Sequence, residues 1–253
     1  MKVRASGATD VGKKRTNNED AFTIRSEQNL YVVADGMGGH SSGEVASQLA
    51  VSHINAFFDR HSLDEDSTWP YPYDEAFSFS ANKVRTAIAI ANDRIQRYST
   101  EHPESRGMGT TVVAALVDRE DLVICHVGDS RAYHFSEGKL SLVTADHSWV
   151  SEQVRMGLLS EEEASRHPLR NVITKALGTR DQAEADVAQV KLAVGDRVLL
   201  CTDGLNSMAS DAEISAVMAR RLDLDATCKA LLLLANEKGG EDNITVIVIE
   251  RVA

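Results

Sequence analysis

Short runs of apolar and β-branched residues recur along the chain, and their length and composition predict β-strands. The pair Glu137-Gly138 lies between two of these runs and predicts a hairpin turn. We expect the runs between residues 110 and 143 to form consecutive antiparallel strands. The predicted strands are residues 5–11, 21–25, 30–34, 110–117, 122–127, 132–135, 140–143, 187–192, 197–202 and 244–249.

Apolar residues spaced three and four positions apart predict helices between these strands. The clearest stripe runs from residue 77 to residue 98. We expect its helix to be capped by Asp74 and to end near His102-Pro103. The other predicted long helices are 42–58, behind a capping-box pattern at Ser41 and Glu44, then 211–222, capped by Ser210 with Glu213, and 223–238.

Two polar segments are expected to lie at the surface. Residues 59–73 are rich in charged residues and contain two prolines, which predicts a loop. Residues 148–171 interrupt the strands with two short helices, at 149–156 and 161–166, the second behind a capping box at Ser160. We call residues 148–171 the flap.

Composition and charge narrow the classes to which the chain can belong. With 253 residues, 43% of them hydrophobic, it can bury a substantial core as one large domain or two small ones. The formal net charge of −11 disfavours a nucleic-acid partner, which would require a basic face. No apolar run approaches the roughly 20 residues of a membrane-spanning helix, and no signal-peptide core follows Met1. We expect no membrane partner.

The three cysteines indicate a reducing compartment. Cys125 and Cys201 lie inside apolar runs and Cys228 lies on an amphipathic helix, so all three are expected in the core. We therefore expect a cytoplasmic protein.

The stretch from Leu30 to Glu44 combines a predicted strand, a glycine-rich turn and the start of a helix. The strand is expected to stop at Asp35, and Gly36, Gly38 and Gly39 allow the backbone to approach a bound group closely. A carboxylate beside a helix N-terminus suits a cation and a phosphate together. The same residues would also suit an ordinary Asp-Gly turn.

Four predicted strands each have an aspartate at one tip: Asp35, Asp129, Asp203 and Asp242. Each one alone is compatible with a turn. Because neighbouring strands bring their tips together, we expect a cluster of carboxylates that requires a cation. No pairing of histidines or cysteines typical of zinc occurs, and oxygen ligands favour Mg²⁺ or Mn²⁺. Two such ions about 3.5–4 Å apart can activate a water toward a phosphorus centre.

Other phosphate chemistries lack their motifs in this sequence. There is no G-x-x-x-x-G-K-[ST] loop and no Cys-x5-Arg. An aspartyl-phosphate phosphatase usually needs a second aspartate two positions after its nucleophile, and Met37 stands there after Asp35. Arg15, Glu19 and Asp20 cluster ahead of a predicted strand and could be either functional or a solvated loop.

Seven motifs occur in an order that resembles the protein phosphatase 2C family of metal-dependent serine/threonine phosphatases. They are R-x-x-N-E-D at 15–20, A-D-G-M-G-G-H at 34–40, G-T-T at 109–111, G-D-S-R at 128–131, D-H-S at 146–148, T-D-G-L at 202–205 and E-D-N-I-T at 241–245. The resemblance covers about Ser6 to Glu250 and looks most like the short bacterial members. It implies one catalytic domain over residues 1–253 with an α+β fold. That fold is a four-layer α-β-β-α sandwich, in which helix pairs flank two antiparallel sheets beside a small helical flap.

The resemblance also implies a centre of two Mn²⁺ or Mg²⁺ ions, or three as in bacterial relatives. By motif, Asp35 would bridge two ions and the Gly36 carbonyl would bind one of them. Asp203 and Asp242 would complete the ligands of the second ion. Asp129 would hold the third ion together with Asp203.

Substrate and water would be placed by other motif residues. Glu19 and Asp20 would hold metal-bound waters, and Arg15 would receive the substrate phosphate. The flap would lie beside the site and affect substrate choice. Asp146 is near the site by motif, but the resemblance assigns it no role.

The sequence departs from the family pattern at the general acid. Eukaryotic relatives have a histidine two residues after the first aspartate, where this chain has Met37. The proton for the leaving group would then come from His40 or from metal-bound water. His40 could instead bond the glycine-rich loop and shape it, which is the role we favour.

The leading functional hypothesis is a monomeric phosphatase for phosphoserine and phosphothreonine proteins, which opposes a bacterial serine/threonine kinase in signal transduction. One alternative is a phosphatase for a single regulator, such as a phosphorylated anti-sigma antagonist. Another is a pseudophosphatase that acts only as a binding module. Since all the ligand positions of the motifs are filled, the sequence favours an enzyme.

Overall fold

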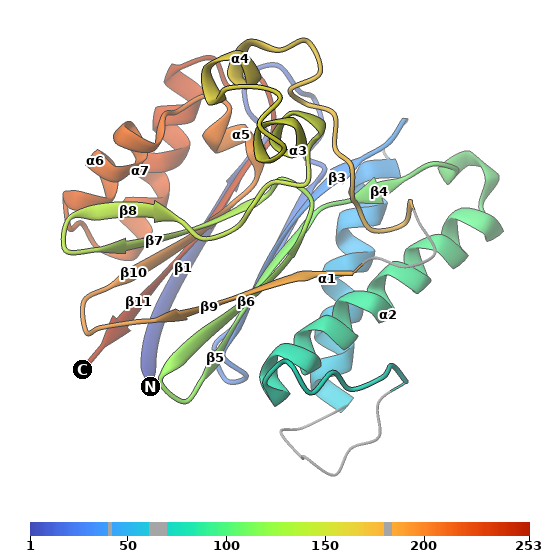
Figure 1. Ribbon diagram of the computed structural model, residues 1–253, viewed down its shortest axis with the longest axis horizontal. Helices are drawn as coiled ribbons and strands as arrows, with labels where there is room; N and C mark the ends of the chain where they lie inside the picture. Colours follow the sequence, from blue (N-terminus) through green and yellow to red (C-terminus); the bar gives the residue numbers. More distant parts are fainter. Residues whose placement is uncertain (40–41, 61–69, 180–183) are drawn as a thin grey trace.

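Two antiparallel β-sheets lie face to face in the computed structural model, which describes residues 1–39, 42–60, 70–179 and 184–253 (Figure 1). One sheet has the order β1-β11-β10-β7-β8, with bounds Lys2–Asp10, Ile244–Val252, Arg197–Cys201, Arg131–Ser136 and Lys139–Leu142. The other has the order β2-β3-β5-β6-β9, with bounds Asp20–Arg25, Leu30–Met37, Val112–Asp118, Asp121–Val127 and Asp186–Lys191. The short strand β4 (Gly109–Thr110) also pairs with β3.

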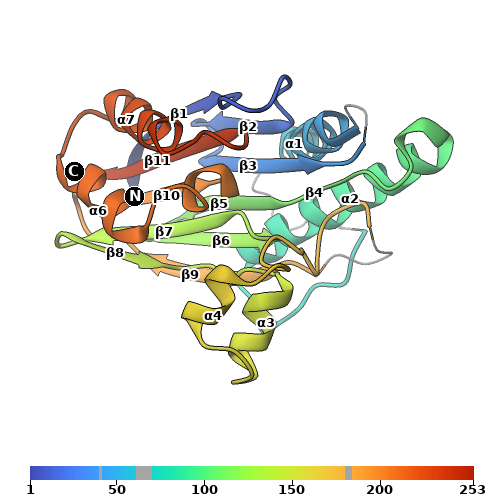
Figure 2. The same cartoon turned by 90° about the horizontal axis from the view of Figure 1, so that it is seen from above.

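Helices cover the outer face of each sheet (Figure 2). The pair α1 (Ser42–Arg60) and α2 (Phe79–Glu101) packs on the sheet that contains β3. The pair α6 (Asp211–Ala219) and α7 (Leu224–Glu237), with the short α5 (Asp203–Asn206), packs on the sheet that contains β11. The flap helices α3 (Trp149–Arg155) and α4 (Glu161–Arg166) project from this body, and η1 (Pro103–Ser105) follows α2. The expected four-layer α+β fold is confirmed.

The central strands are buried on both faces, which explains why their sequences are continuous apolar runs. In β3, Val32 and Ala34 pack toward α1 and α2, whereas Tyr31 and Val33 face the opposite sheet. Strand β11 alternates in the same way between α7 and the space between the sheets. This packing fixes the distance between the sheets and therefore between loops at their ends.

The chain changes sheets between β6 and β7. Strands β5 and β6 form a hairpin in one sheet, whereas β7 pairs with β8 and β10 in the other. The prediction of consecutive antiparallel strands from residue 110 to 143 is wrong at this connection, because the apolar pattern does not reveal strand partners. The hairpin turn at Glu137-Gly138 is confirmed, and both residues have the positive φ, 51° and 81°, of a type I′ turn.

Helix α2 begins later than predicted. Its cap is Ser78, whose side chain accepts a hydrogen bond from the Ala81 N–H at 3.2 Å. Asp74, the predicted cap, instead accepts from the Ala76 N–H at 2.9 Å within the preceding turn. Both residues are good caps, and the one nearer the packed stripe is used. The helix ends at His102 as predicted.

Strand β3 also differs from the prediction, because it continues past Asp35 to Met37. Asp35 pairs with Asp20 of β2, and Gly36 pairs with Thr110 of β4. Neighbouring strands on each side therefore hold the predicted turn residues in extended backbone.

Several smaller predictions have clear outcomes. The capping boxes at Ser160 and Ser210 are present, and the three cysteines are buried with free thiols. Helix α6 ends before the predicted residue 222, and α5 was not predicted. The predictions for His40, Ser41 and residues 61–69 lie outside the described residues. Within the described chain, no helix is both long and apolar enough to cross a bilayer.

Gly36 lies where three backbone segments meet. A Cβ at this position would collide with the carbonyl oxygens of Gly43, at the start of α1, and of Glu19. The Gly36 N–H donates to that Glu19 carbonyl at 3.1 Å. Only glycine permits this approach, which brings the start of α1 against the end of β3.

We predict that Gly36→Ala destabilises the protein by about 2–4 kcal/mol, because the backbone of α1 or β3 must move to admit a methyl group. Gly39→Ala is the matched control, since a Cβ there would meet nothing within 4 Å. Urea unfolding of both variants measures the difference. Equal midpoints for the two variants would contradict the steric argument.

Candidate metal centre

Acidic side chains from five separate segments gather at the end of the sandwich opposite the chain termini. Asp20 begins β2, Asp35 lies near the end of β3, and Asp129 lies in the connection from β6 to β7. Asp203 begins α5, and Asp242 lies just before β11. The charges of the other four all raise the pKa of Asp35, so the predicted meeting of the strand tips occurs in the structure.

Asp20 is held by threonines from the opposite sheet. The Thr202 hydroxyl donates to Asp20 Oδ2 at 2.9 Å, and Thr245 also hydrogen-bonds this carboxyl group. Burial, together with the charges of Asp203 and Asp242, raises the pKa of Asp20 to about 7. Its other oxygen, Oδ1, is buried without a hydrogen-bond partner. Such an orphaned oxygen suits a cation or an ordered water.

Asp35 and Asp203 lie at the middle of the cluster. Burial raises the pKa of Asp35 well above its ordinary value, and the neighbouring carboxylates, with Asp20 first, raise it further. Burial and the charge of Asp242 raise the pKa of Asp203, which is close enough to Asp35 for a hydrogen bond between the two carboxyl groups. Carboxyl groups at this separation can share a proton or a cation.

Asp129 occupies the side of the cluster nearest the flap. It is 9% exposed, and burial together with the charges of Asp203 and Asp146 raises its pKa to about 7. Asp146 itself is engaged elsewhere, because Arg131 donates to both of its oxygens at 2.9 and 2.7 Å. Asp146 therefore orients Arg131, a contact that its motif alone did not reveal.

Arg15 is paired with a predicted metal ligand. Its Nη2 lies 2.7 Å from Asp242 Oδ2, and this bond raises the pKa of Arg15. The side chains are 53% and 36% exposed, so the pair can open to solvent. Glu19 lies beside them, and burial raises its pKa. Arg15 and Glu19 thus border the aspartate cluster.

Asn243 fixes the loop that carries Arg15 and Glu19. Its buried amide donates to the carbonyls of Val11 and Asn17, both at 2.9 Å, and its oxygen accepts from the Glu19 N–H at 2.8 Å. The sequence placed Asn243 in a motif but indicated no role for it. This role depends on loop contacts that appear only in the folded chain.

The arrangement suits hard divalent cations. The aspartates offer only oxygen ligands, burial and then mutual repulsion raise the pKa values of Asp20 and Asp35, and Asp20 Oδ1 has no donor. Mn²⁺ or Mg²⁺ fits this donor set. Met37 lies against Gly109, and His40 is outside the described residues, so a general acid is not identified by the geometry.

The sequence pattern of protein phosphatase 2C matches residues 10–236. The chain belongs to this family. The serine/threonine phosphatase stp of Listeria welshimeri is 36% identical, with 98% of this chain and 96% of that protein covered. The crystal structure of PstP/Ppp from Mycobacterium tuberculosis has a TM-score of 0.87 at 33% identity, and 99% of each chain is covered.

Metal is bound in a solved structure to which this chain is similar. The catalytic domain of PstP in complex with two manganese ions has a TM-score of 0.82 and 33% identity to this chain, with 99% of each chain covered. The phosphatase 2C fold, the family and the enzyme class expected from the sequence are confirmed. The chain is a protein phosphatase.

The raised pKa values predict how stability depends on pH. Asp20 and Asp129 have pKa values of about 7, against an ordinary 3.8, so their protonated forms favour folding below about pH 4. That contribution is lost as the pH rises through about 7, when the charged forms repel. We therefore expect the metal-free protein to lose stability across this window, whereas Mn²⁺ stabilises it increasingly.

Melting with EDTA and with Mn²⁺ between pH 5 and pH 8 measures this effect. The gap in Tm between the two conditions should widen with pH. In Asp20→Asn without metal, the loss of stability should be smaller, because one titrating group is removed. A gap that stays constant over the whole range would show that these carboxyl groups do not bind the ions.

Proposed function

We propose that the aspartate cluster is a dinuclear Mn²⁺ or Mg²⁺ centre at which the chain hydrolyses phosphoserine and phosphothreonine in proteins. The observation that carries this proposal is the burial of mutually repelling carboxyl groups from both sheets at one end of the sandwich. Proteins normally relieve repulsion between buried carboxylates by binding cations.

Each acidic residue has a proposed part. Asp35 would be shared by the two ions, and the carbonyl of Gly36 would be a ligand of one of them. Asp203 and Asp242 are ligands of the second ion. Asp129, with Asp203, holds a third and weaker ion. The pairing of Asp35 with Asp203 supports the shared position that bridging requires.

The bound ions supply Lewis-acid chemistry that activates water and neutralises phosphoryl charge. Glu19 and Asp20 hold and orient water at the edge of the cluster. The orphaned Oδ1 of Asp20 supports this assignment, since it can accept from water once the cluster is charged. Arg15 leaves its ion pair with Asp242 and donates two hydrogen bonds from its planar guanidinium to two phosphate oxygens of the substrate.

The wider setting follows the sequence predictions. We assign residues 1–253 to one catalytic domain, in which the flap at 148–171 affects substrate choice. The protein acts as a monomer in the cytoplasm, where it reverses a serine/threonine kinase in signal transduction. Three buried free thiols support a reducing compartment.

Asp203→Asn should abolish phosphatase activity, with turnover reduced by at least about 10³, because a shared ligand of the ions loses its charge. Asp225→Asn is the matched control, since Asp225 pairs with Lys229 on the exposed face of α7. Mn²⁺ calorimetry and phosphopeptide hydrolysis test both variants, and melting checks the fold. Tight Mn²⁺ binding by Asp203→Asn would refute the assignment.

Arg15→Ala should raise KM for a phosphothreonine peptide by about 10-fold or more, because a charge-assisted fork contributes roughly 1.5–3 kcal/mol. Arg15→Lys should recover only part of this loss, and Arg4→Ala, which also removes an exposed arginine from a carboxylate pair, should leave KM unchanged. If Arg15→Ala instead weakened Mn²⁺ binding at constant KM, Arg15 would be a support for Asp242.

A further inference from the structure

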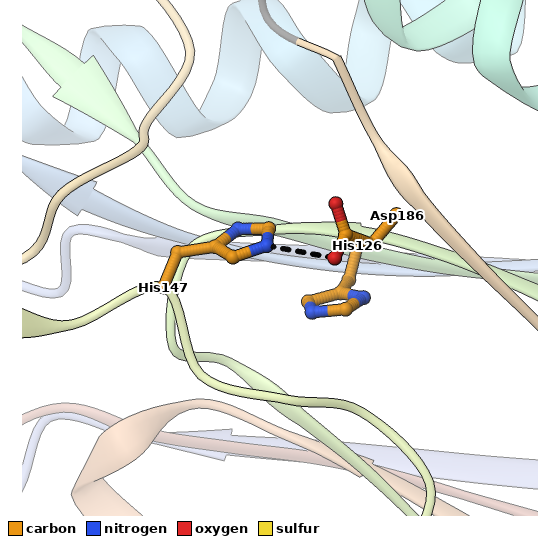
Figure 3. Close-up of side chains that lie close together, drawn as sticks. All are labelled: His126, His147 and Asp186. Carbon is orange, nitrogen blue, oxygen red and sulfur yellow. Dashed lines mark ion pairs between the residues drawn. The ribbon is translucent and has the colours of Figure 1, made fainter. Parts of the chain in front are cut away.

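His126, His147 and Asp186 form a second cluster outside the carboxylate centre (Figure 3). Within the described residues they are the one group of three potential ligands whose donor atoms all lie within 4.8 Å of one another. His126 and Asp186 face each other across β6 and β9, and His147 approaches from the segment before the flap. The two imidazole rings stack, with centroids 4.8 Å apart.

The hydrogen bonds of His147 favour a structural link over a metal site. The Gly128 N–H donates to His147 Nδ1 at 3.0 Å, which places the proton of the neutral ring on Nε2. That Nε2 lies 3.3 Å from Asp186 Oδ2, and Lys175 Nζ lies 3.3 Å from Asp186 Oδ1. An ion bound at Nε2 would move the proton to Nδ1 and leave the buried Gly128 N–H without its acceptor.

Three consecutive residues before the flap hold the connection that carries Asp129. The Ala145 carbonyl lies 2.9 Å from His126 Nε2, and Asp146 pairs with Arg131. His147 binds Gly128 twice, because its own N–H also donates to the Gly128 carbonyl at 3.0 Å. Asp129 lies between these attachment points.

The far side of this connection is already fixed. A Cβ on Gly128 would press against Thr111, and the Thr111 hydroxyl bonds the Ser130 hydroxyl at 2.7 Å. Gly128 has φ 109°, which side chains with a Cβ rarely adopt, and glycine itself can leave this conformation easily unless other contacts hold it. The two bonds from His147 supply that constraint on the side facing the flap.

His147 also joins both ends of the flap. Its carbonyl accepts from the Thr174 N–H at 2.8 Å, just after the flap returns. The Trp149 N–H donates to the Val172 carbonyl at 2.8 Å, so the outgoing and returning strands of the flap meet here. His147 therefore connects the base of the flap to Gly128.

We propose that His147 is a positioning residue that couples the seating of the flap to the placement of Asp129. This inference rests on the proposed role of Asp129 as ligand of the weaker third ion. When the flap base shifts, His147 loosens Gly128, and the Asp129 carboxylate leaves its position toward Asp203.

Two variants of His147 separate its contact with Gly128 from its contact with Asp186. His147→Ala removes both side-chain links, whereas in His147→Asn the amide oxygen can replace Nδ1 as acceptor for Gly128. We expect His147→Ala to speed amide exchange at Gly128 and to raise the Mn²⁺ concentration for the weak step roughly three- to tenfold, the equivalent of one hydrogen bond. His147→Asn should restore both quantities, and the tight ions should bind as in wild type.

Asp186→Asn tests the other contact, and hydrogen exchange on metal-free protein gives a readout independent of activity. Exchange should rise in peptides from both ends of the flap and also at Gly128, though less than in His147→Ala, because His147 couples the two segments. A rise confined to the flap would contradict the coupling. Asp129→Ala separates the two proposals. If it does not alter the weak Mn²⁺ step, the assignment of Asp129 has failed. If it does, and both histidine variants match wild type, the coupling by His147 is refuted.

Zinc titration provides the remaining check. A tight Zn²⁺ site in the wild type that is lost in both His147→Ala and Asp186→Asn would make the cluster a metal site and overturn the positioning role. Melting curves show whether each variant is folded. Should His147→Ala fail to fold, the comparison of His147→Asn with wild type still decides, because an unrestored Gly128 amide would contradict the proposal.

Discussion

The repulsion among buried carboxyl groups is the constraint on which the rest of this structure depends. Asp35 lies within range of four other aspartates, and each would be more stable in water. Hydrogen bonds from neighbouring segments hold several of these residues and their loops in place. Asn243 binds the loop of Glu19, Thr202 binds Asp20, and His147 binds the backbone beside Asp129. The free energy gained by packing the two sheets thus offsets the repulsion between the carboxylates that they bring together.

The two sheets share this task. Asp20 and Asp35 belong to one sheet, whereas Asp203 and Asp242 extend from strands of the other. The distance between these pairs is set by the apolar side chains packed between the sheets, far from any charged group. A change in that packing would alter the spacing of the carboxylates without touching them, so core residues also define the centre.

The positions of four of these aspartates could be predicted from the sequence, because each lies beside an apolar run that forms a strand, although Asp35 lies inside β3 and not at its end. The strand pairing could not be predicted, because an apolar run does not indicate which strand will be its neighbour. The change of sheet between β6 and β7 was therefore missed. Asp74 and Ser78 were equally good caps until packing selected one. The role of Asp146 and the contacts of His147 depend on residues distant in sequence, and no local pattern reports them.

The ion pair between Arg15 and Asp242 has a consequence for the order of events. One guanidinium cannot serve Asp242 and a phosphate at full strength together. Before a cation arrives, Arg15 is the counter-charge for Asp242. On the proposed assignment of Asp242 as a metal ligand, a cation at that carboxylate would release the arginine to bind a substrate phosphate. Cation and phosphoprotein would then assist each other's binding through a single side chain, and by reciprocity each would raise the affinity for the other equally.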